Sequence, residues 1–412
     1  MRKTQSSLHR LGALAGVVLV TTVPAAPAAV ASAASPPAVH FELPQPTGPY
    51  RIGVTDLHLV DHTRNDPWVQ DADRELMVTI RYPALGNGRP LAPFMTPGVA
   101  KAAAEADASA LKLDPGLLEY DFLTHSRTGA AAVRGGGRKP IILYSPGRGV
   151  SRSFGTTQME QLASKGYVVV AIDHTHEAVA VEFPGGRVAR PALPPWNIEV
   201  AKRVLTTRVQ DTRFVLDQLE VLASGGNPDA EQRQLPVALG RLLDLSRVGM
   251  FGHSAGGFTS GETMVSDRRI DAGADLDGSM AYSQSARDFG RVADEGLDRP
   301  FLLMSAGDHS ASSDPSWQQF LSNHRGWRLQ LHVPAGEHFT YTDHQTLLPQ
   351  LITQLGLEPA LQAPIIGNVS PARSVASQRA YLTAYFDEHL RQRPQRLLNG
   401  PSPQHPDVQF LR

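Results

Sequence analysis

The sequence of 412 residues has no cysteine, few lysines and almost no net charge, and each shortage excludes something. Without cysteine there are no disulfide bonds, so the hydrophobic core alone has to stabilise the fold. A hydrophobic content of 41% over this length is ample for such a core. The formal net charge of -1 gives no overall field that would attract nucleic acid or an anionic membrane. Only 6 of the 39 basic residues are lysine, which indicates the coding bias of a GC-rich genome rather than a binding surface.

Long hydrophobic runs are also missing, apart from one near the N-terminus. Basic residues at positions 2, 3 and 10 accompany an apolar run over 11–23, which is too short to span a bilayer comfortably. Small residues follow, with an Ala-Ser-Ala cleavage pattern at 31–33 and no twin arginine before it. This pattern predicts a secretory signal peptide over 1–34, a mature N-terminus near Ser35 and a secreted protein.

The rest of the chain is expected to be a short tether over 35–48, rich in proline and alanine, followed by a single domain over 49–412. From Pro140 onwards, short apolar runs alternate with helical stretches, which is typical of a mostly parallel sheet covered by helices on both faces. The expected strands cover 51–60, 75–82, 141–144, 167–172, 248–251, 272–276, 300–304 and 329–333. The expected helices cover 157–164, 199–222, 256–265 and 376–392. Residues 97–138 are expected to form a helical excursion and a loop, and 183–197 a loop over the functional edge of the sheet.

The most informative motif follows the strand at 248–251. Residues 252–256 (GHSAG) fit the pattern G-x-S-x-G at a turn from a strand into a helix. This turn is a nucleophile elbow, in which a strained backbone exposes the serine hydroxyl and leaves room only for small neighbours. The free N–H groups of the following helix point to where negative charge develops. Ser254 is therefore the candidate nucleophile.

A serine hydroxyl needs a base, and the base needs a carboxylate that orients it. In enzymes that carry a nucleophile elbow, the catalytic residues follow one another along the chain in the order serine, acid, histidine. His338 follows the last expected strand and is the candidate base, with His309 and His344 in reserve. Asp277 and Asp308 each follow a strand downstream of the serine, so either could be the acid.

The oxyanion of an acyl-transfer reaction needs two backbone N–H donors. One should be the N–H of Ala255, directly after the serine. The other should come from the loop after the strand at 141–144, which reads Ser-Pro-Gly-Arg-Gly over 145–149. Pro146 has no N–H, and the candidate donor is the N–H of Arg148.

From about Arg51 to the C-terminus the chain resembles the secreted, plasma-type platelet-activating factor acetylhydrolases and their bacterial lipase-like relatives, which have the α/β-hydrolase fold. The motifs that carry the resemblance are 74–78 (RELMV) leading to Tyr82-Pro83, 144–147 (YSPG), 162–167 (LASKGY), 172–174 (IDH), 252–257 (GHSAGG) and 276–278 (LDG). The resemblance implies Ser254 as nucleophile, His338 as base and Asp277, rather than Asp308, as acid. Pro146 and Arg148 replace the family's usual histidine and leucine, which alters the rim of the acyl pocket.

The expected function is that of a secreted serine esterase or lipase that hydrolyses lipid-like or short-to-medium acyl esters through an acyl-enzyme. Its nearest named activity would be that of a 1-alkyl-2-acetylglycerophosphocholine esterase. A polyester or cutin-type hydrolase, or another serine hydrolase on this fold, is the alternative. A non-catalytic binding module is disfavoured because neither the serine nor its base is lost. We expect no cofactor, no metal and no nucleic-acid partner, a small-molecule or lipid ester as substrate, and at most transient contact with a lipid interface. The oligomeric state stays open.

Overall fold

A computed structural model of the chain describes residues 38–86 and 88–411. The expected signal peptide over 1–34 and its cleavage point near Ser35 lie outside these residues. Among the helices that the structure describes, none combines the length and the apolar character needed to cross a membrane.

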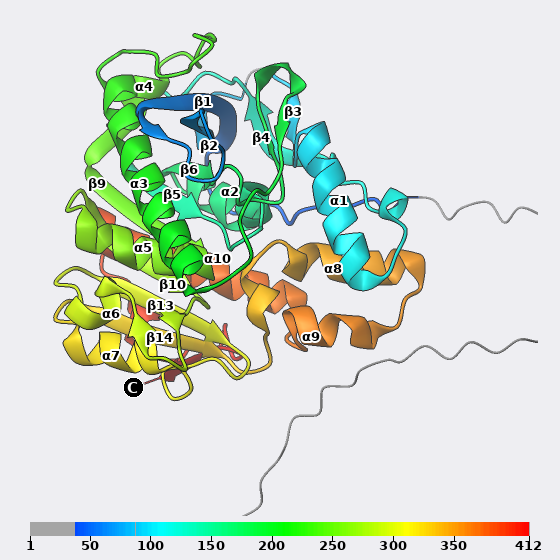
Figure 1. Cartoon of the computed structure of the whole chain (residues 1–412), viewed down its shortest axis with the longest axis vertical. Helices are drawn as coiled ribbons and strands as arrows, with labels where there is room; N and C mark the ends of the chain where they lie inside the picture. Colours follow the sequence, from blue (N-terminus) through cyan, green and yellow to red (C-terminus); the bar gives the residue numbers. More distant parts are fainter. Residues whose placement is uncertain (1–37, 87, 412) are drawn as a thin grey trace, which may run out of the picture. The chain divides into compact units, whose positions relative to one another are not determined.

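The centre of the fold is a twisted sheet of eleven strands (Figure 1). In sheet order the strands are β15 (Gln409–Leu411), β14 (Arg328–Val333), β13 (Phe301–Ala306), β10 (Ile270–Leu276), β9 (Leu243–His253), β5 (Lys139–Ser145), β6 (Val168–Asp173), β2 (Asp73–Ala84), β1 (Arg51–Asn65), β4 (Leu123–Thr128) and β3 (Leu91–Pro93). From β14 to β6 every neighbouring pair is parallel, whereas β2 and β15 run antiparallel to their neighbours. The predicted mostly parallel sheet is confirmed.

The described chain also has two short hairpins, ten α-helices and six short 3₁₀ helices. The hairpins pair β7 (Val181–Glu182) with β8 (Val188–Ala189), and β11 (Ala281–Ser283) with β12 (Asp288–Phe289). The helices are α1 (Pro97–Leu111), α2 (Thr156–Ser164), α3 (Ile198–Ala223), α4 (Leu239–Leu242), α5 (Ala255–Ser266), α6 (Arg291–Glu295), α7 (Pro315–Asn323), α8 (His344–Leu355), α9 (Ala363–Ile366) and α10 (Pro371–Arg391).

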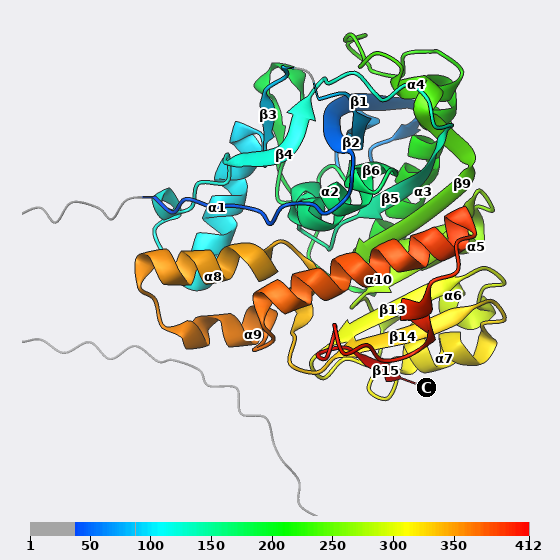
Figure 2. The ribbon, with the colours of Figure 1, turned by 180° about the vertical axis from the view of Figure 1, so that it is seen from behind.

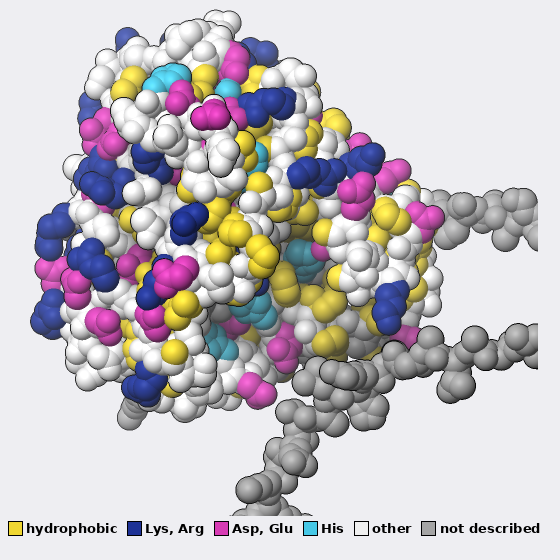
Figure 3. Space-filling view, in the orientation of Figure 1, with side chains coloured by type: hydrophobic (Ala, Val, Ile, Leu, Met, Phe, Trp, Pro, Cys, Tyr) yellow, Lys and Arg dark blue, Asp and Glu magenta, His cyan; other side chains and the backbone are white. Residues whose placement is uncertain are grey.

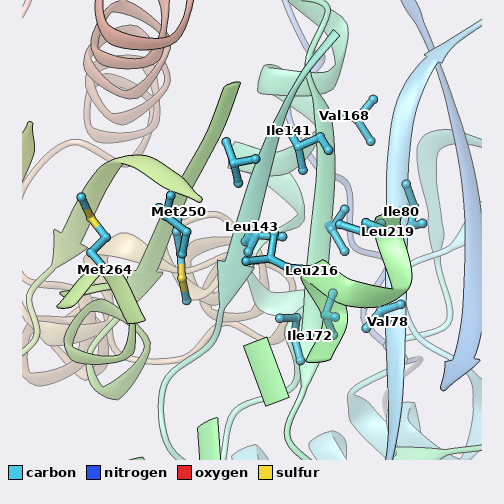
Figure 4. Close-up of a cluster of buried hydrophobic side chains, with 14 of the residues drawn as sticks. Val78, Ile80, Ile141, Leu143, Val168, Ile172, Leu216, Leu219, Met250 and Met264 are labelled. Atoms are coloured by element: carbon cyan, nitrogen blue, oxygen red, sulfur yellow. The ribbon is translucent and has the colours of Figure 1, made fainter. Parts of the chain in front are cut away.

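Alternate residues of the parallel strands point to opposite faces of the sheet, and helices cover both faces. On one face Ile141 and Leu143 of β5 pack with Leu216 and Leu219 of α3, and Met250 of β9 belongs to the same buried cluster (Figure 4). On the other face the intervening residues of β5 pack against α2 and α10, and Figure 2 shows α10 running across that side. Because β5, β6 and β13 are buried on both faces, their sequences are nearly continuous apolar runs.

A third buried cluster lies beside the sheet, where α1, α8 and α9 come together (Figures 1 and 2). It also contains Val39, Phe41 and Leu43, each at most 5% exposed. Residues 38–48 therefore do not form the tether that the sequence predicts. Its alternating apolar side chains point to the same side, as in a strand, and are buried in the cluster.

The N-terminal segment is also held by polar contacts with α8. The backbone N–H and C=O of His40 bond the side-chain amide of Gln354, and those of Glu42 bond the amide of Gln350. The two glutamines are four residues apart and so lie on one face of the helix. They satisfy the polar backbone groups of an otherwise unpaired segment.

Candidate active site

Ser254 lies at the turn between β9 and α5. Its backbone angles are φ 55° and ψ -124°, which a residue with a side chain adopts only at a cost of about 1–3 kcal/mol. Its N–H donates to the carbonyl oxygen of Leu276 at the end of β10. The neighbouring strand thus holds the strained turn in place.

The backbone approaches closely on both sides of this serine. A Cβ atom at Gly252 would collide with the backbone of Gly256, and a Cβ at Gly256 would collide with the carbonyl oxygen of Ser145. The motif G-x-S-x-G therefore has a direct steric reason here, because only glycine lets the strand end and the helix start pack so tightly.

His338 and Asp277 complete a line of hydrogen bonds with the serine. The Oγ atom of Ser254 lies 2.9 Å from Nε2 of His338, and Nδ1 of His338 lies 2.7 Å from Oδ2 of Asp277. Asp277 directly follows β10, with φ 62°, and His338 follows β14 at the start of a short 3₁₀ helix (His338–Tyr341). Three strand ends, belonging to β9, β10 and β14, thus bring the three residues together.

The charge of Asp277 decides where the proton of His338 lies. Burial raises the pKa of Asp277, but hydrogen bonds from His309 and His338 outweigh it and hold that pKa well below its ordinary value. An ionised carboxylate only accepts hydrogen bonds, so the neutral imidazole carries its proton on Nδ1. Nε2 is then free to accept the proton of the Ser254 hydroxyl.

His309 is hydrogen-bonded to the other carboxylate oxygen of Asp277, Oδ1. Its Nδ1 lies 2.9 Å from Oδ1 of Asp277, and its Nε2 lies 3.0 Å from Oδ2 of Asp314. The backbone N–H of Ala306 also donates to Oδ1 of Asp277, at 2.9 Å. Burial lowers the pKa of His309, but its bonds to both carboxylates raise that pKa to about 10. At neutral pH His309 is therefore an imidazolium ion held between two carboxylates.

His253, the residue before the serine, fixes the backbone of His338. Its Nε2 lies 2.8 Å from the carbonyl oxygen of His338, and the two rings lie 4.6 Å apart between centroids. Burial and the neighbouring His338 lower the pKa of His253 to about 3. The ring is thus neutral and donates from Nε2 to that carbonyl.

The loop after β5 packs directly on the serine. A Cβ at Gly147 would lie 3.4 Å from the Cβ of Ser254. Arg208 of α3 is buried and donates to the carbonyl oxygen of Pro146 at 2.7 Å, which holds this loop against the elbow. The N–H of Arg148 follows in the same loop, while its guanidinium lies 3.9 Å from the ring centroid of Trp196. Trp196, from the segment 183–197 that was expected to be a loop, thus contacts the loop after β5.

Ala255 is the first residue of α5, so its N–H has no acceptor within the helix. Gly257 and Phe258 already donate back to the carbonyl oxygen of Ser254. The N–H of Ala255 can therefore serve a ligand at the serine, as the motif implies.

The remaining candidates lie elsewhere. Asp308 is exposed, and the carboxylate that contacts His338 is that of Asp277. His344 contacts Asp107 at 3.3 Å, at the start of α8. The role of His253 was not anticipated, and its position directly before Ser254 was its only signal. His309 was expected as a reserve base, but not as a partner of Asp277.

Comparisons with known proteins indicate the family to which the chain belongs. The family described as "Platelet-activating factor acetylhydrolase, isoform II" matches residues 109–189. A protein of Arthroderma benhamiae named "Probable 1-alkyl-2-acetylglycerophosphocholine esterase" is 30% identical over 401 residues, 90% of this chain and 94% of the relative. A "Platelet-activating factor acetylhydrolase" of Cavia porcellus is 23% identical over 364 residues, 83% of this chain and 78% of the relative.

Among solved structures, the ferulic acid esterase of Streptomyces cinnamoneus matches with a TM-score of 0.74 and 36% sequence identity. The match covers 90% of this chain and 99% of the esterase chain. The relatives are esterases or acetylhydrolases, and their substrates are small-molecule esters by name. The chain thus belongs to the platelet-activating factor acetylhydrolase family and is a carboxylic ester hydrolase with the α/β-hydrolase fold.

Proposed function

We propose that this protein is a secreted serine esterase that forms an acyl-enzyme on Ser254. The observation that carries the proposal is the line of hydrogen bonds from Ser254 through His338 to an ionised Asp277. Each member of this line has a defined role in acyl transfer: nucleophile, general base and orienting carboxylate. The strained backbone of Ser254 adds support, because a nucleophile elbow uses such a turn to present its serine hydroxyl.

In the first half of the reaction, Oγ of Ser254 attacks the ester carbonyl carbon and its proton passes to Nε2 of His338. The tetrahedral intermediate then breaks its bond to the alkoxy oxygen, which leaves as the alcohol with the proton from Nε2. Asp277 stays ionised and stabilises the imidazolium ion that forms between these two steps.

In the second half, water attacks the acyl-enzyme while Nε2 of His338 takes one of its protons. The bond from the carbonyl carbon to Oγ breaks, Ser254 recovers its proton, and the carboxylic acid is released. The oxyanion of each intermediate would accept hydrogen bonds from the N–H groups of Ala255 and Arg148. Losing one such donor costs about 10²–10³-fold in kcat in other enzymes.

Two substrate classes follow from the names of the relatives. The relatives named for platelet-activating factor favour lipid esters with a short acyl group, such as 1-alkyl-2-acetylglycerophosphocholine. The ferulic acid esterase, with the higher identity of 36%, favours esters of aromatic acids. Secretion is supported by the N-terminal pattern of basic residues, a short apolar run and small residues.

The test of the nucleophile uses a fluorophosphonate probe and peptide mass spectrometry on the full mature protein. We expect one label per chain, on Ser254, and parallel loss of p-nitrophenyl acetate hydrolysis. Ser254→Ala should lose both, whereas the exposed Ser285→Ala serves as the matched control and should keep both. Labelling of another serine, with Ser254→Ala still active, would refute the proposal.

A further inference from the structure

A small pocket of about 290 Å³ opens between α1 and α8, and we call it the α1–α8 pocket. Alanine and leucine side chains from the two helices form much of its lining. Four aromatic rings and one acid–base pair make up its distinctive walls: Phe41, Tyr120, Phe154, Phe339, Asp107 and His344. In Figure 3 the face of the molecule is hollowed beside α1, and hydrophobic and histidine side chains line the hollow.

The pocket adjoins the candidate active site at two residues. Phe339 follows His338 directly, and its ring centroid lies 5.5 Å from that of His338. Arg148, whose N–H is a candidate oxyanion donor, also lines the pocket. The pocket thus shares Arg148 with the candidate oxyanion site and is lined by the residue next in the chain to the candidate base.

Flat aromatic walls surround part of this space. The ring of His344 stacks on Phe154 with centroids 4.2 Å apart and planes inclined by 18°. Phe339 meets His344 edge to face at 5.2 Å, and Tyr120 meets Phe154 at 5.7 Å and 83°. Offset-stacked and edge-to-face contacts are the arrangements that aromatic rings prefer. A planar aromatic ring of a ligand could make stacked or edge-to-face contacts with these side chains.

One wall of the otherwise apolar α1–α8 pocket carries the carboxylate of Asp107. The hydroxyl of Tyr120 donates to Oδ2 of Asp107 at 2.7 Å, and Nε2 of His344 lies 3.3 Å from the same oxygen. Burial raises the pKa of Asp107, but His344 and Tyr120 outweigh this and lower it, so the carboxylate is ionised. Its side chain is still 23% exposed, so a ligand can reach it. Oδ1 has only a long contact of 3.4 Å to His344 and can accept another hydrogen bond.

These features discriminate among acyl groups. An acetyl group has only a methyl group beyond its carbonyl carbon, which is too small to fill the pocket. A volume of 290 Å³ lies at the lower end of ligand sites, which suits a ring rather than a long alkyl chain. An alkyl chain would also desolvate the carboxylate of Asp107 without giving it a hydrogen bond, which is unfavourable.

We propose that the α1–α8 pocket binds the acyl group of the ester and selects a planar aromatic acyl group with a hydroxyl at its far end, which donates to Asp107. The ring lies against Phe154, His344 and Phe339. This inference rests on the proposed reaction at Ser254 and adds the acyl class that the site takes.

The test compares methyl 4-hydroxycinnamate with methyl cinnamate, which differ only in the hydroxyl group, and includes p-nitrophenyl acetate as a substrate whose acetyl group is too small to fill the pocket. We expect kcat/KM of the wild type to favour the hydroxylated ester by at least about tenfold, because a site built for a hydroxyl rejects the analogue without it. Asp107→Asn should remove most of this preference, since a neutral acceptor bonds more weakly than a carboxylate. Turnover of p-nitrophenyl acetate by the same variant, measured in parallel, separates a loss of the preference from a general loss of activity.

Two further variants sharpen the test. Tyr120→Phe removes the donor that competes for Asp107, so it should keep or raise the preference for the hydroxylated ester. Asp121→Asn changes an exposed carboxylate nearby and should behave as the wild type.

A wild type without the preference, or an Asp107→Asn variant that keeps it, would overturn the inference. If Asp107→Asn does not fold and loses acetate turnover, two other results test the inference. These are the ratio of kcat/KM for the two cinnamate esters in the wild type and the same ratio in Tyr120→Phe. Acetate hydrolysis by Ser254→Ala at close to the wild-type rate would instead overturn the proposed reaction.

Discussion

The imidazolium ion of His309, held between Asp277 and Asp314, makes the stability of the protein depend on pH in a predictable way. Its pKa is raised from 6.5 to about 10 in the folded chain. Between these two pH values the folded state binds one more proton at this site than the unfolded state. Stability therefore falls as pH rises, by at most about 1.4 kcal/mol per pH unit.

From pH 7 to pH 9 the loss from His309 alone amounts to about 2.5 kcal/mol, because the unfolded imidazole is still partly protonated at pH 7. His309→Gln keeps a side-chain N–H donor for Asp277 but has no proton to lose. The wild type should therefore lose about 2.5 kcal/mol more than His309→Gln over this range. Other titrating groups contribute equally to both proteins and cancel in the difference.

Urea unfolding at pH 7, 8 and 9, followed by circular dichroism, measures the free energy of unfolding of both proteins. His62→Gln is the control, because its side chain is 78% exposed and should leave the pH dependence of the wild type intact. A constant difference between the wild type and His309→Gln from pH 7 to pH 9 would refute the reasoning. His309 would then be neutral in the folded protein.

Three further predictions concern the chemistry and the N-terminus. Ser254→Ala should lose almost all ester turnover but keep roughly 10³–10⁴-fold catalysis over water, measured with p-nitrophenyl acetate. Asp277→Asn should lower kcat by about 10⁴-fold through the wrong tautomer of the base, while Asp308→Asn keeps most of the activity. Circular dichroism checks that both variants are folded. If the folded Asp308→Asn is inactive, Asp308 rather than Asp277 is the residue that orients His338. N-terminal sequencing of secreted protein should begin near Ser35, and a chain that still starts at Met1 would contradict the predicted cleavage.

The strands and the elbow could be predicted from sequence because their signals are local. The central parallel strands β5, β6 and β13 are short apolar runs, and the turn at Ser254 needs glycines at fixed positions. The structure brings Ser254, His338 and Asp277 together, the combination that the family resemblance favoured over one with Asp308. Spacing alone could not choose between the two aspartates, since both follow strands at the same edge of the sheet.

Other parts depend on contacts between distant segments, which a single sequence does not reveal. The segment at 38–48 looks like a tether because it is rich in proline, yet it is buried through contacts with α8, about 310 residues later in the chain. Strand β4 has polar residues at five of its six positions and lies in the segment 97–138, which was expected to form a helical excursion and a loop. His309 was expected only as a reserve base. Its actual position depends on Asp314 and on the second oxygen of Asp277.

If the α1–α8 pocket selects the acyl group, proteolytic removal of the N-terminal segment at 38–48 should change which esters the enzyme prefers. Phe41 forms part of the α1–α8 pocket, and the residues on either side of it hold α8. A protease that removed the segment through Phe41 would open one wall of the pocket and release α8, while the strand ends that carry Ser254 and Asp277 would be untouched. The shortened enzyme would still react with a fluorophosphonate but would distinguish less well between acyl groups. The same reasoning guides protein engineering, because an affinity tag or fusion partner joined upstream of residue 38 leaves this wall intact.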